Sequence, residues 1–294
     1  MTCYHPLTAY RLDNGEISFN EKGKTKQKLT LPCGQCQGCR LERSRSWAVR
    51  CIHEAKMHKE NCFITLTYND ENHQYDLIYP HFQKFLKRLR KKYPHKNIRY
   101  YMAGEYGEEN NRPHFHACLF GIDFPDKRLF RALPSGSNLY TSKLLEQLWP
   151  FGYSTIGDVT FESAAYVARY VMKKVTGQRA ADHYEICCPY TGEIKPITPE
   201  FNRMSLKPGI GKPFLEKYCS DIYPNGTIIH NGSKQKPPRF YEKWYAELQP
   251  LKYEELQYQR LLKVNYDDQT KQRLADAEKV CKARLTHKKR GFQK

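Results

Sequence analysis

The pattern of apolar and polar positions divides the chain into an irregular start, a regularly patterned centre and a charged helical end. After residue 40, apolar side chains recur at helical spacing through LERSRSWAVRCIHEAKMHKE, which predicts an amphipathic helix. The β-branched and aromatic run FITLTY predicts a strand over 63–68. HFQKFLKRLRKKY, which follows Pro80, predicts a second helix with one apolar stripe and one basic face.

The same patterns continue to residue 176, with a longer loop rich in Pro, Gly and Ser between 121 and 141. Strands are expected at 98–107, 114–121 and 152–159, and helices at 142–149 and 162–175. The order β-α-β-β-α-β-α is typical of a ferredoxin-like (RRM-like) antiparallel sheet with helices on one face. We therefore predict an α+β fold with a Cys-rich N-terminal segment and a helical C-terminal extension.

Four segments follow from these boundaries. Residues 1–42 form a Cys-rich, zinc-binding segment, whose first 32 residues are polar and predict no regular element. Residues 43–176 form the core, 177–240 a turn-rich extension packed on it, and 241–294 a charged helical tail that ends in THKKRGFQK.

Charge narrows the class of partner. The chain of 294 residues carries 49 Lys and Arg against 31 Asp and Glu, a net charge of +18. Such a surface attracts polyanions, and it predicts salt-sensitive binding. No run approaches the roughly 18 apolar residues that a membrane helix needs, and the start lacks the regions of a signal peptide. We therefore expect a cytoplasmic protein with no membrane partner.

His114 and His116 lie two residues apart in a predicted strand, so both imidazoles point to the same face. An isolated H-x-H is more often two ordinary surface histidines. Here the preceding strand ends in Glu105, and a hairpin would bring its carboxylate beside the pair; Glu108 and Glu109 compete from the turn. Two histidines and a carboxylate suit Mn²⁺ or Mg²⁺ with open positions for a phosphate oxygen.

Two tyrosines, Tyr166 and Tyr170, lie four residues apart on a predicted helix and so share one face. Tyrosines on a helix are usually packed in a core, but the alanines and valines of this helix already supply an apolar face. A phenol with a pKa near 10 attacks a phosphodiester poorly unless positive charge is near. The basic neighbours that could help catalysis are Arg169, Lys173 and Lys174.

Three cysteines are spaced as C-x2-C-x2-C, at Cys33, Cys36 and Cys39. With Cys3 as a distant fourth ligand they would form a closed tetrahedral thiolate site for structural Zn²⁺; His5 competes for the fourth position. An iron–sulfur cluster is the alternative, although the Cys-Pro that usually follows is absent. The other seven of the 11 cysteines are expected to be small buried apolar residues.

Basic side chains supply candidate contacts to DNA. Arg112 precedes the histidine strand and could hold a phosphate at the mouth of the site. The basic face of the second helix provides Lys87, Arg88, Lys91 and Lys92.

With these residues identified, the chain resembles the replication initiators of small single-stranded DNA phages, the microviruses, and above all their gokushovirus branch. Several independent stretches carry the resemblance: MTCYHP, PCGQCQGCRLERSRSWAVRCIHEA, CFITLTYND, RYYMAGEYGEENNRPHFHACLFG, ESAAYVARYVMKK and PEFNRMSLKPGIG. These proteins are similar in turn to the HUH endonuclease superfamily. Its first motif corresponds to Phe63–Tyr68, its metal motif to His114 and His116, and its nucleophile motif to Tyr166 and Tyr170.

The resemblance implies a function. Such a protein nicks the viral strand at the origin, stays attached to the 5′ end through a phosphotyrosine, and leaves a 3′-hydroxyl for the host polymerase. It later cleaves and ligates the displaced strand. The partners implied are single-stranded and origin DNA in the host bacterial cytoplasm, with no small-molecule substrate. No helicase phosphate loop occurs in the sequence, so a host helicase is expected to unwind the DNA.

Three other functions remain to be weighed. A zinc-containing nucleic-acid-binding protein without catalysis would explain the charge and the cysteines, but not the histidine strand and the tyrosine helix together. A plasmid relaxase usually has its tyrosine before the histidines, whereas here it follows them. A two-histidine phosphoesterase needs two H-x-[ST] motifs, and none of the 11 histidines is followed by Ser or Thr at that spacing.

Overall fold

The computed structural model describes residues 3–21, 25–107, 111–133, 136–173, 175, 180–187 and 192–291, with the backbone alone for 170–173 and 287–291. The chain forms two compact units, which we treat separately. Unit 1 contains residues 1–43 and 250–294, and unit 2 contains residues 44–249.

Unit 2 is built on a seven-stranded antiparallel sheet in the order β12-β5-β6-β4-β9-β8-β7. Its strands are β4 (Asn61–Tyr68), β5 (Arg99–Tyr106), β6 (Pro113–Phe120), β7 (Arg128–Ala132), β8 (Asn138–Thr141), β9 (Gly152–Gly157) and β12 (Phe201–Met204). The central order β5-β6-β4-β9 is the ferredoxin-like arrangement. The fold class predicted from the sequence is thus confirmed.

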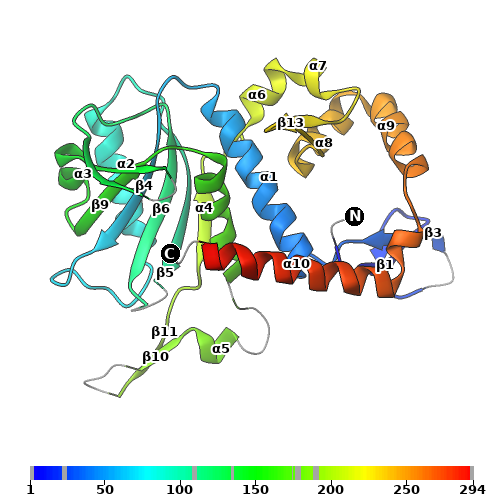
Figure 1. Cartoon of the computed structure of the whole chain (residues 1–294), viewed down its shortest axis with the longest axis horizontal. Coiled ribbons are helices and arrows are strands. Elements are labelled where there is room, and N and C mark those ends of the chain that lie inside the picture. The colour runs from blue at the N-terminus through cyan, green and yellow to red at the C-terminus, as the bar shows by residue number, and fades with distance from the viewer. Residues whose placement is uncertain are drawn as a thin grey trace. The chain divides into compact units, whose positions relative to one another are not determined.

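One face of this sheet carries the larger apolar core. Residues of β4 alternate strictly between buried and half-buried, and the buried set, such as Ile64 and Leu66, points to this face. Helices α2 (Tyr79–Lys92) and α3 (Lys143–Leu148) cover it, with Phe82, Phe85 and Trp149 fully buried among the strands. Figure 1 shows both helices on the same side of the sheet.

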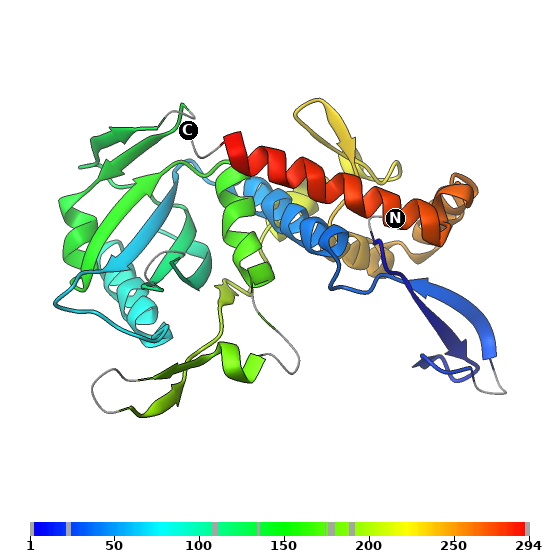
Figure 2. The ribbon, with the colours of Figure 1, turned by 60° about the horizontal axis from the view of Figure 1, so that its bottom comes forward.

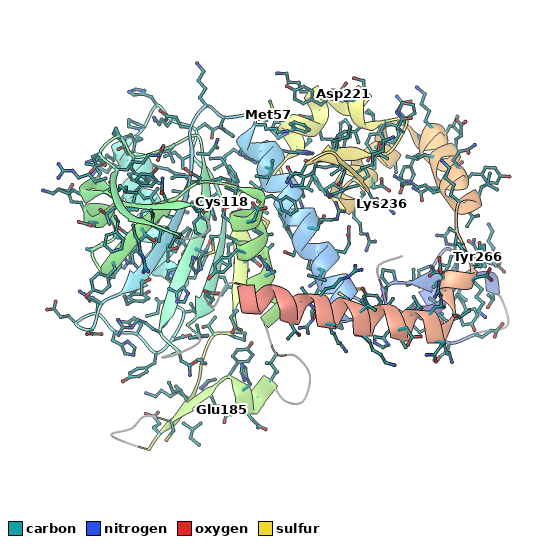
Figure 3. All side chains as sticks on the ribbon, viewed as in Figure 1. Met57, Cys118, Glu185, Asp221, Lys236 and Tyr266 are labelled. Carbon is teal, nitrogen blue, oxygen red and sulfur yellow. The ribbon has the colours of Figure 1, made fainter. Side chains whose placement is uncertain are left out.

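The opposite face is also covered in part, which corrects the expectation of helices on one face alone. Helices α1 (Gln37–Ala55) and α4 (Phe161–Lys173) pack there on β5 and β6. Cys118, labelled in Figure 3, lies between the sheet and α4. The small residues Ala103, Ala164 and Ala168 of this second core permit the close approach. Because β5 and β6 are buried on both faces, they show no alternation that would reveal the second layer.

Strands β7, β8 and β12 lie where the sequence predicted a loop or only turns. All five residues of β7 are exposed, so the strand has no apolar face to mark it. Its pairing with β8 shifts register between Leu129 and Arg131, which leaves Phe130 as the extra residue of a β-bulge.

The remaining elements of unit 2 follow α4 in the chain. They are α5 (Ala180–His183), β10 (Glu185–Cys187), β11 (Ile194–Pro196), α6 (Lys212–Lys217), α7 (Cys219–Ile222), β13 (Ile228–His230), β14 (Ser233–Gln235) and α8 (Arg239–Leu248). The β10–β11 hairpin projects away from the sheet in both views of the ribbon (Figures 1 and 2). At its base, the Tyr184 hydroxyl donates to Glu200 Oε2 at 2.5 Å.

Buried charge fixes the chain beyond β12 to the core. Glu54, with a fully buried side chain, pairs with Arg99 and accepts from the Gly211 amide at 2.6 Å. Arg99 in turn donates to the Pro208 carbonyl at 2.6 Å. Burial raises the pKa of the Glu54 carboxyl, but hydrogen bonds from His58, Gly211 and Arg99 hold it below its ordinary value.

Unit 1 begins with a three-stranded sheet of β1 (Leu7–Leu12), β2 (Ile17–Ser18) and β3 (Thr25–Leu31). The expectation of no regular element in the first 32 residues was therefore wrong. Strand β3, TKQKLTL, is mostly exposed and polar, so its pattern gives no strand signal. The unit ends with α9 (Pro250–Leu262), the 3₁₀ helix η1 (Asp267–Gln269) and α10 (Lys271–Gly291), as expected for a helical C-terminal extension. Among the described residues, no helix has the length and apolar character to span a bilayer.

Candidate metal and nucleophile site

The pairing register brings the predicted metal ligands together. Glu105 on β5 lies directly opposite His114 on β6, and Ala103 lies opposite His116. Cross-strand partners share a face of the sheet, so all three ligand side chains point to the face on which α4 packs. The hairpin inferred from the sequence therefore brings the carboxylate to the two imidazoles.

The ligand atoms are close enough to share one cation. Oε1 of Glu105 lies 2.5 Å from Nε2 of His114 and 2.9 Å from Nε2 of His116. Ligands about 2.1 Å from an octahedral ion are separated by about 3.0 Å when they are neighbours. These spacings fit a Mg²⁺- or Mn²⁺-sized ion, and the described residues form a group that could hold one.

Hydrogen bonds orient the two imidazoles. Nδ1 of His114 lies 3.0 Å from the carbonyl oxygen of Arg112, which can only accept, so Nδ1 carries the hydrogen. In the neutral ring Nε2 then has a lone pair that faces the carboxylate. Nδ1 of His116 bonds the hydroxyl of Thr65 at 2.9 Å. Outer partners of this kind fix the tautomer of a ligating histidine.

Glu105 itself favours a cation at this position. Its residue is 3% exposed, and Oε2 is buried without a hydrogen-bond partner among the described residues. Burial raises the pKa of its carboxyl, but the hydrogen bonds and charges of His114 and His116 hold it below the ordinary value. A buried carboxylate with one unpartnered oxygen is costly unless charge compensates it.

Tyr166 extends from α4 to this group of ligands. Its ring lies edge-on to that of His116, with 5.1 Å between centroids, and the residue is 40% exposed. The helix is held in place because Ala164, Val167 and Ala168 are buried, and because the Ser44 hydroxyl donates to a carbonyl of α4. One tyrosine of the predicted pair is thus near the metal ligands and open to solvent.

The other residues predicted to help catalysis are located less fully. Tyr170 and Lys173 belong to the backbone of α4, but their side chains lie outside the described residues, and Lys174 lies outside them entirely. Arg169 is exposed, and its Nε donates to the Ala165 carbonyl at 3.4 Å.

The predicted DNA contacts fall at two different places. Arg112 bridges two strand ends, donating to the Tyr68 carbonyl at 3.0 Å and to Asp70 Oδ1 at 2.5 Å. The competing acids Glu108 and Glu109 lie outside the described residues. The basic residues of α2 lie on the helix that covers the face opposite the metal ligands. Of these, Arg88 donates to the Leu148 carbonyl at 2.7 Å, whereas the exposed residues are Lys87, Lys91 and Lys92.

Two residues that shape the site were not identified from the sequence. Phe63 stacks on the His116 ring, with 5.7 Å between centroids, and Thr65 bonds the same imidazole. Both belong to the half-buried set of β4. The alternation of FITLTY carried this signal, because residues 63, 65 and 67 share the face opposite the apolar core.

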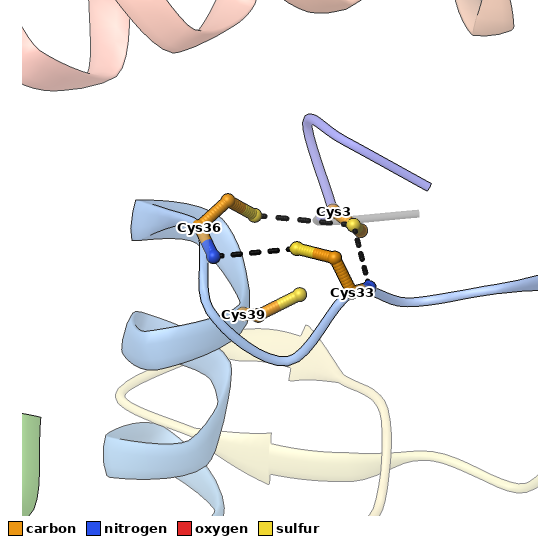
Figure 4. A group of neighbouring side chains, drawn as sticks. All are labelled: Cys3, Cys33, Cys36 and Cys39. Atoms are coloured by element: carbon orange, nitrogen blue, oxygen red, sulfur yellow. Dashed lines mark hydrogen bonds between the residues drawn. The ribbon is translucent and has the colours of Figure 1, made fainter. Parts of the chain in front are cut away.

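A second group of possible metal ligands lies in unit 1. The sulfur atoms of Cys3, Cys33, Cys36 and Cys39 all lie within 4.8 Å of one another (Figure 4). Zn–S bonds of about 2.3 Å imply S···S edges of about 3.8 Å in a tetrahedron, and the Cys36 and Cys3 sulfurs are 3.9 Å apart. The described cysteines can therefore hold a metal such as zinc.

Backbone amides point at these sulfurs. The amides of Tyr4, Cys33 and Cys36 donate to Sγ atoms at 3.2–3.3 Å. Although burial raises the pKa of the Cys36 thiol, amide hydrogen bonds from Cys39 and Tyr4 lower it to about 6. The competing ligand His5 instead pairs with Glu278 of α10 at 2.8 Å.

Comparison with known proteins agrees with this arrangement. Residues 61–175, which contain the histidine strand and the tyrosine helix, match the family model of the replication-associated protein ORF2. The chain is 34% identical over 266 residues to replication-associated protein VP4 of Bdellovibrio phage phiMH2K, covering 87% of this chain and 80% of that protein.

Two further relatives have similar descriptions. Replication-associated protein ORF2 of Spiroplasma virus 4 is 31% identical over 269 residues, covering 83% of this chain and 80% of that protein. Replication-associated protein ORF4 of Chlamydia phage 1 is 30% identical over 221 residues, covering 72% of this chain and 52% of that protein. No solved structure matches the chain.

Proposed function

Because the chain belongs to the family of replication-associated proteins of small phages, we propose that it starts rolling-circle replication by nicking the viral strand at the origin. The observation that carries this proposal is the convergence of Glu105, His114 and His116 beside an exposed tyrosine. We assign this chemistry to residues 43–176, with residues 1–42 as a zinc-binding segment and the rest as extensions.

Glu105, His114 and His116 are the residues that would hold Mg²⁺ or Mn²⁺. When bound, such an ion polarises the scissile phosphate and stabilises charge on its oxygens. Thr65 and the Arg112 carbonyl keep both imidazoles in the orientation that directs Nε2 to the cation. Phe63 packs against the His116 ring and limits water on that side.

Tyr166 is the nucleophile of this proposal. Its phenolic oxygen attacks the phosphorus, forms the O–P bond of a 5′-phosphotyrosine, and releases its proton to solvent. The bond from phosphorus to the 3′ oxygen breaks, and that oxygen takes up a proton to become the 3′-hydroxyl primer. One ester replaces another, so no external energy source is needed, and the step can be reversed by a hydroxyl.

Tyr170, one turn further along α4, is the proposed second nucleophile that cleaves the displaced strand and allows its ligation. Arg169, Lys173 and Lys174 would lower the charge cost of both steps. Single-stranded and origin DNA are the substrates, and a host polymerase and helicase in the bacterial cytoplasm would extend and unwind the strand. Arg112 and the basic α2 surface at Lys87, Arg88, Lys91 and Lys92 are proposed DNA contacts.

A covalent adduct is the direct test. Labelled single-stranded DNA that covers the origin is incubated with the full chain and Mn²⁺, and denaturing gels separate the protein–DNA adduct. We expect an adduct with wild type and its loss in the Tyr166→Phe, Tyr170→Phe double variant. Tyr258→Phe, an exposed tyrosine of α9, serves as the matched control. Absence of an adduct with every divalent metal would leave a zinc-containing DNA-binding protein without catalysis.

A further inference from the structure

A groove of about 550 Å³ lies at the edge of the sheet where β8 and β9 separate. Its lining includes Phe130, Thr141, Glu146, Gly152, Tyr153 and Thr155. We propose that this groove receives an unstacked base of single-stranded DNA close to the cleavage point. The inference rests on the proposed function, because it names the way in which the same site holds its substrate.

Two large aromatic side chains are exposed at this groove. Phe130 is 65% exposed and Tyr153 is 64% exposed. Apolar side chains of this size are rarely left in water without a role when they share one concave surface. Every nucleobase has a π-face that can stack on an aromatic ring, and such stacking is a principal source of affinity for single strands.

The register shows that Tyr153 and the metal ligands share one face of the sheet. His114 lies opposite Thr67 on β4, and Thr67 lies opposite Tyr153 on β9. Two strand spacings separate the histidine from the tyrosine, or about 10 Å. A DNA strand rises about 3.4 Å per nucleotide, so a base at Tyr153 is about three nucleotides from a phosphate at the metal ligands.

The surface between these two points is open and polar. Helix α4 packs on β5, β6 and β12, and the half-buried residues Thr65, Thr67 and Thr155 lie beyond it. In the part of the chain that the structure describes, β8 pairs with β9 through Tyr140 and Ile156 alone. The first half of β9 therefore faces the groove instead of a neighbouring strand.

The bulge in β7 supports a ligand other than another strand. It leaves Phe130 out of the β7–β8 ladder, and bulges commonly redirect a side chain toward a functional site. The exposed arginines Arg128 and Arg131 flank Phe130. Charged side chains on an edge strand oppose pairing with another chain, whereas next to an aromatic ring they suit a DNA backbone. Glu146 is the acidic group of the groove, and its carboxylate can accept from the amino group of a base.

The test separates base stacking from backbone attraction. The full chain is titrated, without added divalent metal, against a labelled oligothymidylate, against the same backbone with every base removed, and against a duplex. We expect Phe130→Ala and Tyr153→Ala each to weaken binding of oligothymidylate by about five- to a hundredfold. Binding of the abasic strand and of the duplex should change by less than twofold, and Tyr153→Phe should bind as wild type does.

Tyr258→Ala, which removes an exposed tyrosine from α9, is the matched control and should leave every affinity unchanged. The inference is overturned if neither groove variant affects oligothymidylate, or if both weaken the abasic strand equally. It is also overturned if Phe130→Ala changes the oligomeric state on sedimentation and not the affinity, since the groove would then receive a second copy of the chain.

This outcome is independent of the nicking test. If the groove variants bind as wild type does while wild type still forms the tyrosine adduct, the groove inference fails and the proposed function stands. If they lose binding but no adduct forms with any metal, the groove remains a single-strand site and the catalytic proposal fails.

Discussion

Replacing Glu105 by glutamine is the change that best isolates the proposed metal site. The side chain keeps its size and one acceptor oxygen, but it loses the charge that the two histidines need as a third ligand. Glu105 is buried, with Oε1 within 2.9 Å of both imidazoles. We expect the Glu105→Gln variant to fold and to lose its response to Mn²⁺.

The size of the effect follows from linkage between binding and stability. An ion that binds only the folded state, at a hundred times its dissociation constant, stabilises it by about 2.7 kcal/mol. For a folded region of about 200 residues, 1 kcal/mol moves the Tm by about 2–4 °C. Wild type should therefore gain roughly 5–10 °C on saturation with Mn²⁺, and the variant should gain less than 1 °C.

Scanning calorimetry with and without Mn²⁺ measures this shift, with each protein serving as its own metal-free reference. Hard Mn²⁺ competes poorly for thiolates, so the cysteine group should keep its own metal during the titration. Glu200→Gln is the matched control, because Glu200 is also a buried acid but accepts from Tyr184. A full Mn²⁺ shift in Glu105→Gln would refute the ligand assignment.

Three further predictions concern single side chains. Thr65→Val should weaken Mn²⁺ about tenfold or more by calorimetric titration, because His116 loses its orienting partner; unchanged affinity would contradict this. Cys36→Ser should remove bound zinc, measured by elemental analysis, and equal zinc content would exclude Cys36 as a ligand. Burial lowers the pKa of His53 to about 3, whereas the unfolded value is near 6.5. Because the unfolded chain then binds the extra proton, stability should fall by up to about 1.4 kcal/mol per unit as pH drops below 6.5. His53→Phe, which keeps the stack on Phe214, should flatten that part of the urea-unfolding profile, and an unaltered slope would contradict the assignment.

The part of the fold that could be predicted from the sequence is the part whose burial is regular. β4 alternates without interruption and α2 has one apolar stripe, so both elements are evident in the sequence. The metal ligands could be predicted for the same reason, since H-x-H in a strand has only one arrangement of its side chains. Glu105 needed one further step, a tight hairpin, and the register of β5 and β6 bears it out.

The rest could not be predicted because its signal is not local. β7 has five exposed residues, and β3 is mostly polar. Both are strands because of the partner they pair with, and their own side chains do not indicate it. The same holds for β12, four residues long, which pairs with the outer edge of β5. The groove at Phe130 and Tyr153 depends on these added strands, so it was beyond reach of the sequence pattern.

The distance between nucleophile and metal ligands depends on residues that look unremarkable in the sequence. Tyr166 reaches His116 because α4 lies close to the sheet. That approach is possible because alanine occupies the contact on both sides, at Ala103 in β5 and at Ala164 and Ala168 in α4. Close-packed interiors transmit a change of volume to their neighbours, so a larger side chain here would move the tyrosine away from the histidines. The chemistry of this site is therefore set as much by its smallest apolar residues as by the ligands themselves.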